Sequence, residues 1–200
     1  MSKSGTDSST RRNGHNRTGI LVRKARLRDA EQIAHLINHF AAQGLMLPKN
    51  ILEVYEHIRE YVVAEDETGQ VVGCGALRLM WHDLGEIRSL AVAETAQGRG
   101  VGRRIVELLL EEARELGLAC VFALTYQVPF FEKLGFRVVP KAIFPQKVWL
   151  DCQLCPKRLC CDETAMILVL DEERTAAGFK EWARFSFEGV GAGDRAEAVA

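Results

Sequence analysis

The stretch ETAQGRGVGRR, residues 94–104, decides the expected fold because it places alternating glycines directly before an apolar helical pattern. Gly98, Gly100 and Gly102 remove side chains where a helix would begin. Consecutive backbone N–H groups at a helix N-terminus bind anions such as a pyrophosphate. The alternative is a turn that uses glycine only for its conformational freedom.

Two common nucleotide-binding motifs do not fit this stretch. A P-loop requires Lys followed by Ser or Thr after its last glycine, whereas Arg103 and Arg104 follow Gly102. A Rossmann loop requires a third glycine three residues after the second, and that position is Arg103 or Ile105. Both motifs are therefore excluded.

The flanking segments predict a βαβ unit around the glycines. GEIRSLAV, residues 85–92, is typical of a strand, and ACVFALT, residues 119–125, of a strand buried on both faces. A helix is predicted over residues 102–116 by apolar residues at spacings of four and three: Ile105, Leu109, Ala113 and Leu116. A strand-helix-strand crossover places its two strands in parallel.

The segments before this unit predict antiparallel strands and two helices. ILVRKA, residues 20–25, indicates a strand, and Asp29 is a candidate N-cap for a helix with an apolar period through Phe40. A second helix is expected over residues 51–59. YVVAED and QVVGCGALRLM flank ETG, residues 67–69, as a hairpin. We therefore expect an α/β (α+β) fold: a mixed, mostly antiparallel sheet with a central parallel pair and helices on both faces.

Composition excludes several classes of partner. Of 200 residues, 48% are hydrophobic, and 26 Lys and Arg against 27 Asp and Glu give a net charge of −1. Such a chain has no global field for a nucleic acid or an anionic membrane. No apolar run approaches the roughly 20 residues that span a bilayer, and the N-terminus lacks the pattern of a secretory signal. We expect a cytoplasmic enzyme-sized domain, with homo-oligomerisation left open.

The polar composition at the N-terminus predicts a disordered arm over residues 1–18. The domain is expected over residues 19–185, with a cysteine-rich loop at residues 145–163, and a flexible tail over residues 186–200.

The motif Gln97-x-x-Gly100-x-Gly102 after a strand, with FFEKLGF at residues 130–136, resembles the acetyl-CoA signature of the GNAT N-acetyltransferase superfamily. The resemblance covers about residues 20–170. Within the superfamily, GEIRSLAV and VFALTYQVPFFEKLGF resemble the short-form N-acetylglutamate synthases. The resemblance implies a GNAT fold and transfer of acetyl from acetyl-CoA to the α-amine of an amino acid, L-glutamate first, in arginine biosynthesis. The alternatives are acetylation of another small amine, or a non-catalytic sensor that binds CoA and metal.

The resemblance also implies which residues bind the cofactor. Main-chain groups of Leu90, Ala91 and Val92 would bind the pantetheine arm and the acetyl carbonyl. Arg99, Arg103 and Arg104 are candidates for the outer phosphates, or are solvated. The pyrophosphate would lie on the backbone of Gln97, Gly98, Arg99, Gly100, Val101, Gly102 and Arg103.

Acetyl transfer needs a base for the amine and an acid for the thiolate. Glu86, near the start of the predicted thioester strand, is the candidate base, the alternative being an exposed carboxylate. Many superfamily members have a tyrosine immediately before EKLGF, where this chain has Phe131. Tyr126 is therefore the candidate acid, with water as the alternative.

Three further residues are candidates for the acceptor site. Arg88 lies on the same strand face as Glu86 and would pair with an acceptor carboxylate or with Glu86 itself. Lys49 is a candidate acceptor-binding residue or a surface lysine. Thr125 would hydrogen-bond the acceptor or its own backbone.

Four of the six cysteines, Cys152, Cys155, Cys160 and Cys161, crowd one short segment. Structural zinc usually draws ligand pairs from two knuckles with a longer spacer. Zinc is therefore considered but not favoured, a redox pair or free thiols being the alternatives. No metal ligand is assigned.

Overall fold

The computed structural model describes residues 19–144, 155, 157 and 160–188, with side chains described up to residue 181. The expected N-terminal arm, residues 1–18, lies outside the described residues. So do residues 189–200 of the expected tail and most of the cysteine-rich loop, including Cys152.

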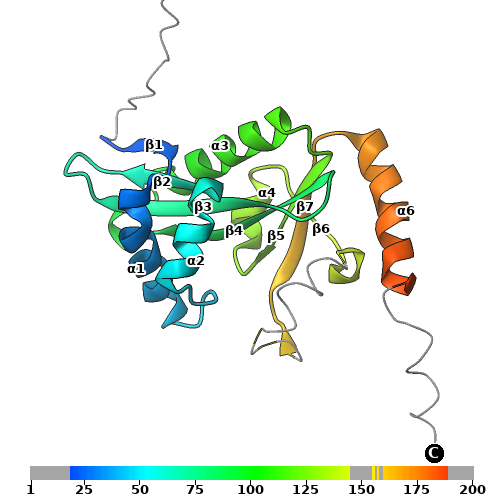
Figure 1. Cartoon of the computed structure of the whole chain (residues 1–200), viewed down its shortest axis with the longest axis horizontal. Helices are drawn as coiled ribbons and strands as arrows, with labels where there is room; N and C mark the ends of the chain where they lie inside the picture. The colour runs from blue at the N-terminus through cyan, green and yellow to red at the C-terminus, as the bar shows by residue number, and fades with distance from the viewer. Residues whose placement is uncertain (1–18, 145–154, 156, 158–159, 189–200) are drawn as a thin grey trace, which may run out of the picture.

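A seven-stranded sheet forms the centre of the domain, in the order β1-β2-β3-β4-β5-β7-β6 (Figure 1). Among these strands, β4 and β5 pair in parallel and the other neighbours pair antiparallel. The predicted mixed sheet with a central parallel pair is thus confirmed. The strands are β1 (Leu21–Lys24), β2 (Tyr61–Glu65), β3 (Val71–Leu79), β4 (Leu84–Val92), β5 (Cys120–Thr125), β6 (Arg137–Val138) and β7 (Thr164–Val169).

Helices cover both faces of the sheet. α3 packs on one face, and α1 and α2 lie on the other (Figure 1). The helix predicted over residues 102–116 is α3, while the short α4 and the C-terminal α6 were not predicted. The described helices are α1 (Ala30–Ala41), α2 (Ile51–Glu56), α3 (Val101–Glu115), α4 (Val128–Glu132) and α6 (Glu172–Glu188), and the 3-10 turns are η1 (Leu27–Asp29), η2 (Ile58–Glu60), η3 (Glu94–Ala96) and η4 (Lys141–Ile143).

The strand alternation divides the core between the two faces. On β2, Val62 and Ala64 belong to the cluster beneath α3, whereas Tyr61 and Val63 belong to the cluster beneath α1. A third cluster around Phe122 of β5 fills the part of the sheet that packs against η4 and α6. This two-sided burial fixes the register of each strand, because a shift by one residue would exchange the faces.

Asp29 directly precedes α1, as predicted, but its side chain does not cap that helix. Its carboxylate accepts hydrogen bonds from the N–H of Arg26 at 2.7 Å and from Nη1 of Arg23 at 2.6 Å. Arg23 also binds Glu65 on β2. The carboxylate therefore joins β1 to the start of α1 instead of satisfying the helix terminus.

Within the described residues, no helix is both long and apolar enough to cross a lipid bilayer.

Candidate active site

The site begins where the two parallel strands separate. β4 and β5 are paired at Leu84, Gly85 and Glu86, and the pairing ends there although β4 continues to Val92. The edge of β4 that would face β5 is therefore open beyond Glu86. Unpaired main-chain groups on such an edge can bind an extended ligand as a further strand would.

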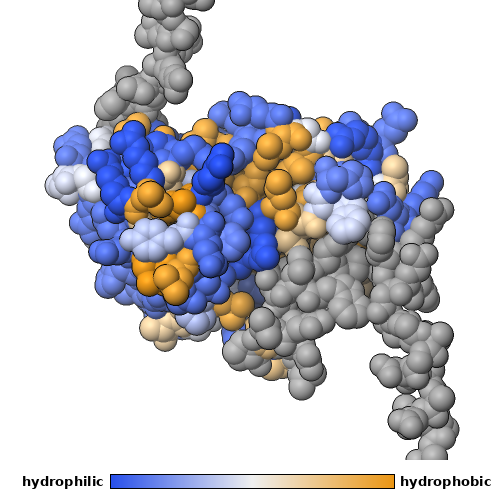
Figure 2. Space-filling model, in the orientation of Figure 1, coloured by the Kyte–Doolittle hydropathy of each residue, from blue (hydrophilic) through white to orange (hydrophobic). Residues whose placement is uncertain are grey.

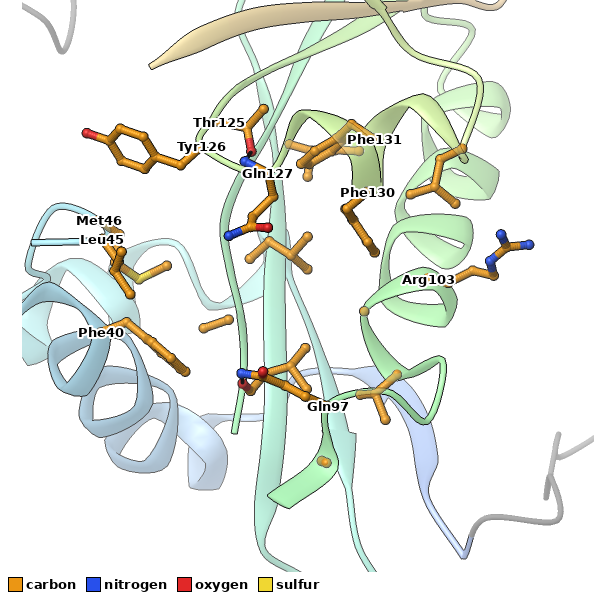
Figure 3. A pocket seen from close by; sticks show the side chains of 18 of the residues that line it. Phe40, Leu45, Met46, Gln97, Arg103, Thr125, Tyr126, Gln127, Phe130 and Phe131 are labelled. Atoms are coloured by element: carbon orange, nitrogen blue, oxygen red, sulfur yellow. Dashed lines mark hydrogen bonds between the residues drawn. The ribbon is translucent and has the colours of Figure 1, made fainter. Parts of the chain in front are cut away.

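A pocket of about 740 Å³ occupies this gap (Figure 3). Its walls come from β4, the glycine loop, the end of β5, α4, and the end of α1 with the following loop. Glu86, Arg88, Lys49 and Arg99 are not among the lining residues. The sequence-predicted residues that line it are Leu90, Ala91, Val92, Gln97, Gly98, Gly100, Val101, Gly102, Arg103, Thr125 and Tyr126.

The glycine loop presents free N–H groups to the pocket. Gly98 and Gly100 have φ of +72° and +76°, a conformation that favours glycine, and a Cβ added at either would meet no atom within 4 Å. The first hydrogen bond of the helix runs from the Arg104 N–H to the Gly100 carbonyl at 3.1 Å. Within the described glycine loop, the N–H groups of the following residues donate no main-chain hydrogen bond: Gly98, Gly100, Val101, Gly102 and Arg103. The loop thus has the donors and the space that a phosphate requires.

The polar side chains of the loop differ in what they contact. The Gln97 amide donates a hydrogen bond of 2.9 Å to the carbonyl of Val92 and so fastens the loop to the end of β4. Arg103 is exposed at the pocket end opposite Tyr126 (Figure 3). Arg104 donates to the carbonyl of Ile20 at 3.0 Å, so its guanidinium holds the start of the described chain.

Glu86 is buried rather than exposed, with 2% of its surface accessible. It is the third residue of β4 and lies opposite Phe122, at the last paired position before the strands separate. Glu86 therefore lies on β4 next to the point where the strands separate, although it does not form part of the pocket wall.

The three predicted acceptor residues differ in position. Thr125 is buried and lines the pocket, and its hydroxyl accepts a hydrogen bond of 2.8 Å from the N–H of Gln127, so it serves its own backbone. Arg88 is half-buried on β4, two residues beyond Glu86. Lys49 lies just before α2, with its Nζ 3.9 Å from Glu53 Oε2, and its main chain is hydrogen-bonded to the Asn38 side chain of α1.

Tyr126 lies at the other end of the pocket, beside Leu45 and Met46 (Figure 3). Its hydroxyl donates to Asp162 Oδ1 at 2.6 Å and accepts from Lys157 Nζ at 2.9 Å. The hydrogen bond to Asp162 raises the pKa of Tyr126, and the bond from Lys157 opposes this rise. The hydrogen bond from Tyr126 lowers the pKa of Asp162.

Sequence reasoning missed much of the pocket wall. Phe131 lines the pocket. Its ring also packs edge-on against the ring of Phe136, with 5.1 Å between the ring centroids. One signal was available in the sequence, since the loop after α1 contains two consecutive apolar residues, Leu45 and Met46, and both line the pocket. Figure 2 shows apolar surface over α1, α2 and the loop between them. The missed lining residues include Phe40, Gln43, Leu45, Met46, Glu94, Leu124, Gln127, Phe130, Lys133, Leu134 and Glu163.

A hydrogen bond connects α1 to the loop after β4 beside this wall. His39 Nε2 lies 3.0 Å from Glu94 Oε1, and Gln43 lies 3.1 Å from the same ring nitrogen. The hydrogen bond with His39 lowers the pKa of Glu94. Gln43 and Glu94 both line the pocket, so this contact joins the α1 side of the wall to η3, which precedes the glycine loop.

The cysteine segment reaches the site through Glu163. Cys161 Sγ lies 3.9 Å from Glu163 Oε2, and Glu163 lines the pocket. Cys155, Cys160 and Cys161 are free thiols. The described residues contain no group of three or more metal-ligating side chains. Cys152, which a four-thiolate site would need, lies outside them.

Comparison with known proteins identifies the family. Residues 27–136 match the acetyltransferase (GNAT) family model. The chain is 44% identical over 149 residues to an uncharacterized N-acetyltransferase of Chlorobaculum tepidum, covering 74% of this chain and 96% of that protein. The chain therefore belongs to the acetyltransferase (GNAT) family.

Within this family the chain is similar to amino-acid acetyltransferases. It is 46% identical over 121 residues to the amino-acid acetyltransferase of Mycobacterium tuberculosis, covering 60% of this chain and 69% of that protein. A crystal structure of a Mycobacterium tuberculosis protein in complex with CoA is 36% identical, with a TM-score of 0.66, and covers 75% of this chain and 99% of that one. The N-acetylglutamate synthase of Neisseria gonorrhoeae, complexed with CoA and N-acetyl-glutamate, is 28% identical with a TM-score of 0.68, over 76% of this chain and 35% of that one.

Proposed function

We propose that this enzyme transfers the acetyl group of acetyl-CoA to the α-amine of an amino acid, with L-glutamate as the preferred acceptor. One observation carries the proposal: a row of free N–H groups in the glycine loop adjoins the open edge of β4. Acetyl-CoA requires this combination, because its pyrophosphate and its extended pantetheine arm are continuous.

The residues fit acetyl-CoA as follows. The N–H groups at Gly98, Gly100 and the first turn of α3 would bind the pyrophosphate, where the positive end of the helix dipole adds to the attraction. The pantetheine arm would run along Leu90–Val92, which line the pocket. The thioester would then lie beside Leu90, at the end of this stretch nearer to the point where β4 and β5 separate.

The chemistry requires two proton transfers. The amine nitrogen attacks the thioester carbonyl carbon, and Glu86 takes the amine proton through a water molecule, because Glu86 adjoins the pocket without lining it. The C–S bond then breaks, and the CoA thiolate takes the proton of Tyr126. Lys157, which donates to the Tyr126 oxygen, stabilises the phenolate that remains.

The acceptor is the finer part of the proposal. The similarity to proteins named amino-acid acetyltransferase supports an amino acid, and the N-acetyl-glutamate complex of the Neisseria gonorrhoeae enzyme supports glutamate. Arg88 and Lys49 are the proposed partners of acceptor carboxylates, and Thr125 lines the proposed acceptor path. Acetylation of another small amine is the competing function.

The test is release of the CoA thiol over a panel of amino acids and simple amines, with the acetylated product identified by mass spectrometry. L-glutamate is expected to give the highest kcat/KM. Faster turnover of amines that lack an α-carboxylate would contradict the amino-acid assignment and favour the competing function.

A further inference from the structure

The strand beside the proposed thioester contains a bulge. β3 and β4 are in register at Cys74 and Ala91, and again at Ala76 and Arg88. Between these pairs one residue of β3, Gly75, faces two residues of β4, Ser89 and Leu90. A bulge of this kind redirects the strand and breaks the regular pattern of main-chain hydrogen bonds.

Ser89 adopts a conformation that serine rarely adopts. Its φ is +52°, and it is the one non-glycine residue with a positive φ among the described residues. The left-handed conformation at the first residue of a bulge usually requires glycine. Contacts around Ser89 must therefore offset the cost of placing a side chain there.

Two buried side chains make these contacts. The hydroxyls of Tyr61 and Ser89 are hydrogen-bonded to one another, and Tyr61 is 3% exposed on β2. Cys74 Sγ donates to the Ser89 carbonyl at 3.6 Å and is completely buried on β3. One partner thus holds the Ser89 side chain and the other holds its main chain.

The next residue along β4 connects the bulge to the pocket. Leu90 lines the pocket directly after Ser89. A Cβ added at Gly75 would lie 3.2 Å from Leu90 Cδ1 and 2.9 Å from Ile105 Cγ2, so the glycine leaves the space that Leu90 occupies against α3. The direction of the Leu90 main chain therefore depends on the shape of the bulge.

We propose that Tyr61 and Cys74 are positioning residues for acetyl transfer, which hold Ser89 in its left-handed conformation and so direct the Leu90 main chain toward the thioester. The inference rests on the proposed function, because it places the thioester beside Leu90. Neither residue lines the pocket, so both act through Ser89.

The experiment compares Tyr61→Phe, Cys74→Ala and the double variant Tyr61→Phe/Ser89→Gly. Loss of either contact lets Ser89 leave the left-handed region, and kcat is expected to fall by about tenfold or more, since displaced reacting groups lose rate steeply. The KM for acetyl-CoA should change little, because the glycine loop is intact. Glycine adopts a positive φ without a partner, so the double variant should recover most of the lost kcat.

Two controls separate positioning from general damage. Tyr55→Phe removes the hydroxyl of a half-exposed tyrosine on α2, and Cys120→Ala removes a buried thiol on β5; both should retain kcat. Unchanged kcat in folded Tyr61→Phe, or failure of Ser89→Gly to restore it, would overturn the proposal.

A second measurement stays informative if the parent protein turns over no acetyl-CoA, which would refute the proposed function alone. Amide hydrogen exchange at residues 89–92 should be faster in Tyr61→Phe and return toward the parent rate in the double variant. Equal exchange in the parent and in Tyr61→Phe would show that Tyr61 does not hold the bulge.

Discussion

The hydroxyl of Tyr126 donates a hydrogen bond of 2.6 Å to Asp162, which lies just before β7. The proton that Tyr126 would give to the CoA thiolate is therefore hydrogen-bonded to a carboxylate. Lys157 Nζ donates a hydrogen bond of 2.9 Å to the same oxygen, and this bond lowers the pKa of Tyr126. This pair of partners makes the assignment of Tyr126 as the acid testable by pH.

Turnover should respond in opposite directions to the two partners of Tyr126. An acid must be protonated to act, so the rate falls as pH rises through its pKa. Asp162 raises the pKa of Tyr126 and Lys157 lowers it. Asp162→Asn should therefore move the alkaline limb of kcat to lower pH, and Lys157→Met should move it to higher pH. Tyr126→Phe should cut kcat by about 100-fold.

The control for this series is Tyr55→Phe, since Tyr55 lies on α2 and does not line the pocket. Its pH profile should overlay that of the parent. If Tyr126→Phe keeps the parent kcat, or if Asp162→Asn and Lys157→Met move the alkaline limb in the same direction, water is the acid instead.

CoA affinity should depend on the absence of a side chain at Gly100. Its φ is +76° and the space around it is open, where phosphate oxygens would approach the loop. Gly100→Val is expected to weaken CoA binding at least about tenfold, or about 1.4 kcal/mol. Calorimetric titration with CoA measures the change.

Gly117 supplies a matched control for backbone strain. It has a φ of +74° at the end of α3, with equally open space, but does not line the pocket. Gly117→Val should lower Tm and leave CoA affinity unchanged. Similar losses of CoA affinity in both variants would show that backbone strain causes the effect of Gly100→Val. The assignment of this loop as the phosphate-binding site would then be rejected.

Glu86→Gln should depress turnover at neutral pH and recover part of it at high pH, where free amine is available without a base. The loss expected for a general base is about 10²–10⁴-fold. The amide keeps the shape of a residue that is 2% exposed, so CoA affinity serves as the check that β4 is intact. A pH-rate profile that overlays the parent would reject Glu86 as the base.

The central elements of the fold could be predicted because their sequence patterns are local. The 3.6-residue period of α3 and the glycine stop after it are independent of the rest of the chain. α4 has five residues and β6 has two, lengths over which no period can be recognised. The prediction that the Asp29 side chain caps α1 was wrong, because Arg23, on a neighbouring strand, binds the carboxylate.

The glycine loop could be recognised because its motif is continuous in sequence, and the family resemblance implied the Leu90–Val92 edge. The structure brings both into one pocket, and their binding of CoA stays a prediction. The opposite wall of the pocket could not be predicted from the sequence. Leu45 and Met46 lie in a loop without periodicity, and the partners of Tyr126 depend on where the segment before β7 returns to the sheet. Such contacts follow from tertiary structure rather than from spacing along the chain.

Stability at low pH should depend on Asp29. Its carboxylate is almost completely buried; burial by itself raises the pKa, but hydrogen bonds from Arg23 and from the Arg26 N–H outweigh it and lower the pKa below its ordinary value. A carboxyl whose pKa is lower in the folded state stabilises the fold above its unfolded pKa, about 3.9. That contribution is lost as pH falls through the folded value. Asp29→Asn should therefore cost about 3 kcal/mol at pH 7, because it leaves Arg23 with less compensation.

The decisive measurement for Asp29 is the free energy of unfolding by urea at several pH values. As pH falls below about 4, the difference between the parent and Asp29→Asn should shrink, because the unfolded parent takes up a proton at Asp29 before the folded parent does. Asp66→Asn is a useful comparison: hydrogen bonds from Thr68 and nearby backbone also lower the pKa of Asp66, but it lies in the exposed β2–β3 turn. Its destabilisation should be smaller at pH 7. A difference for Asp29→Asn that stays constant from pH 7 to pH 3 would show that the carboxylate charge does not stabilise the junction of β1 and α1.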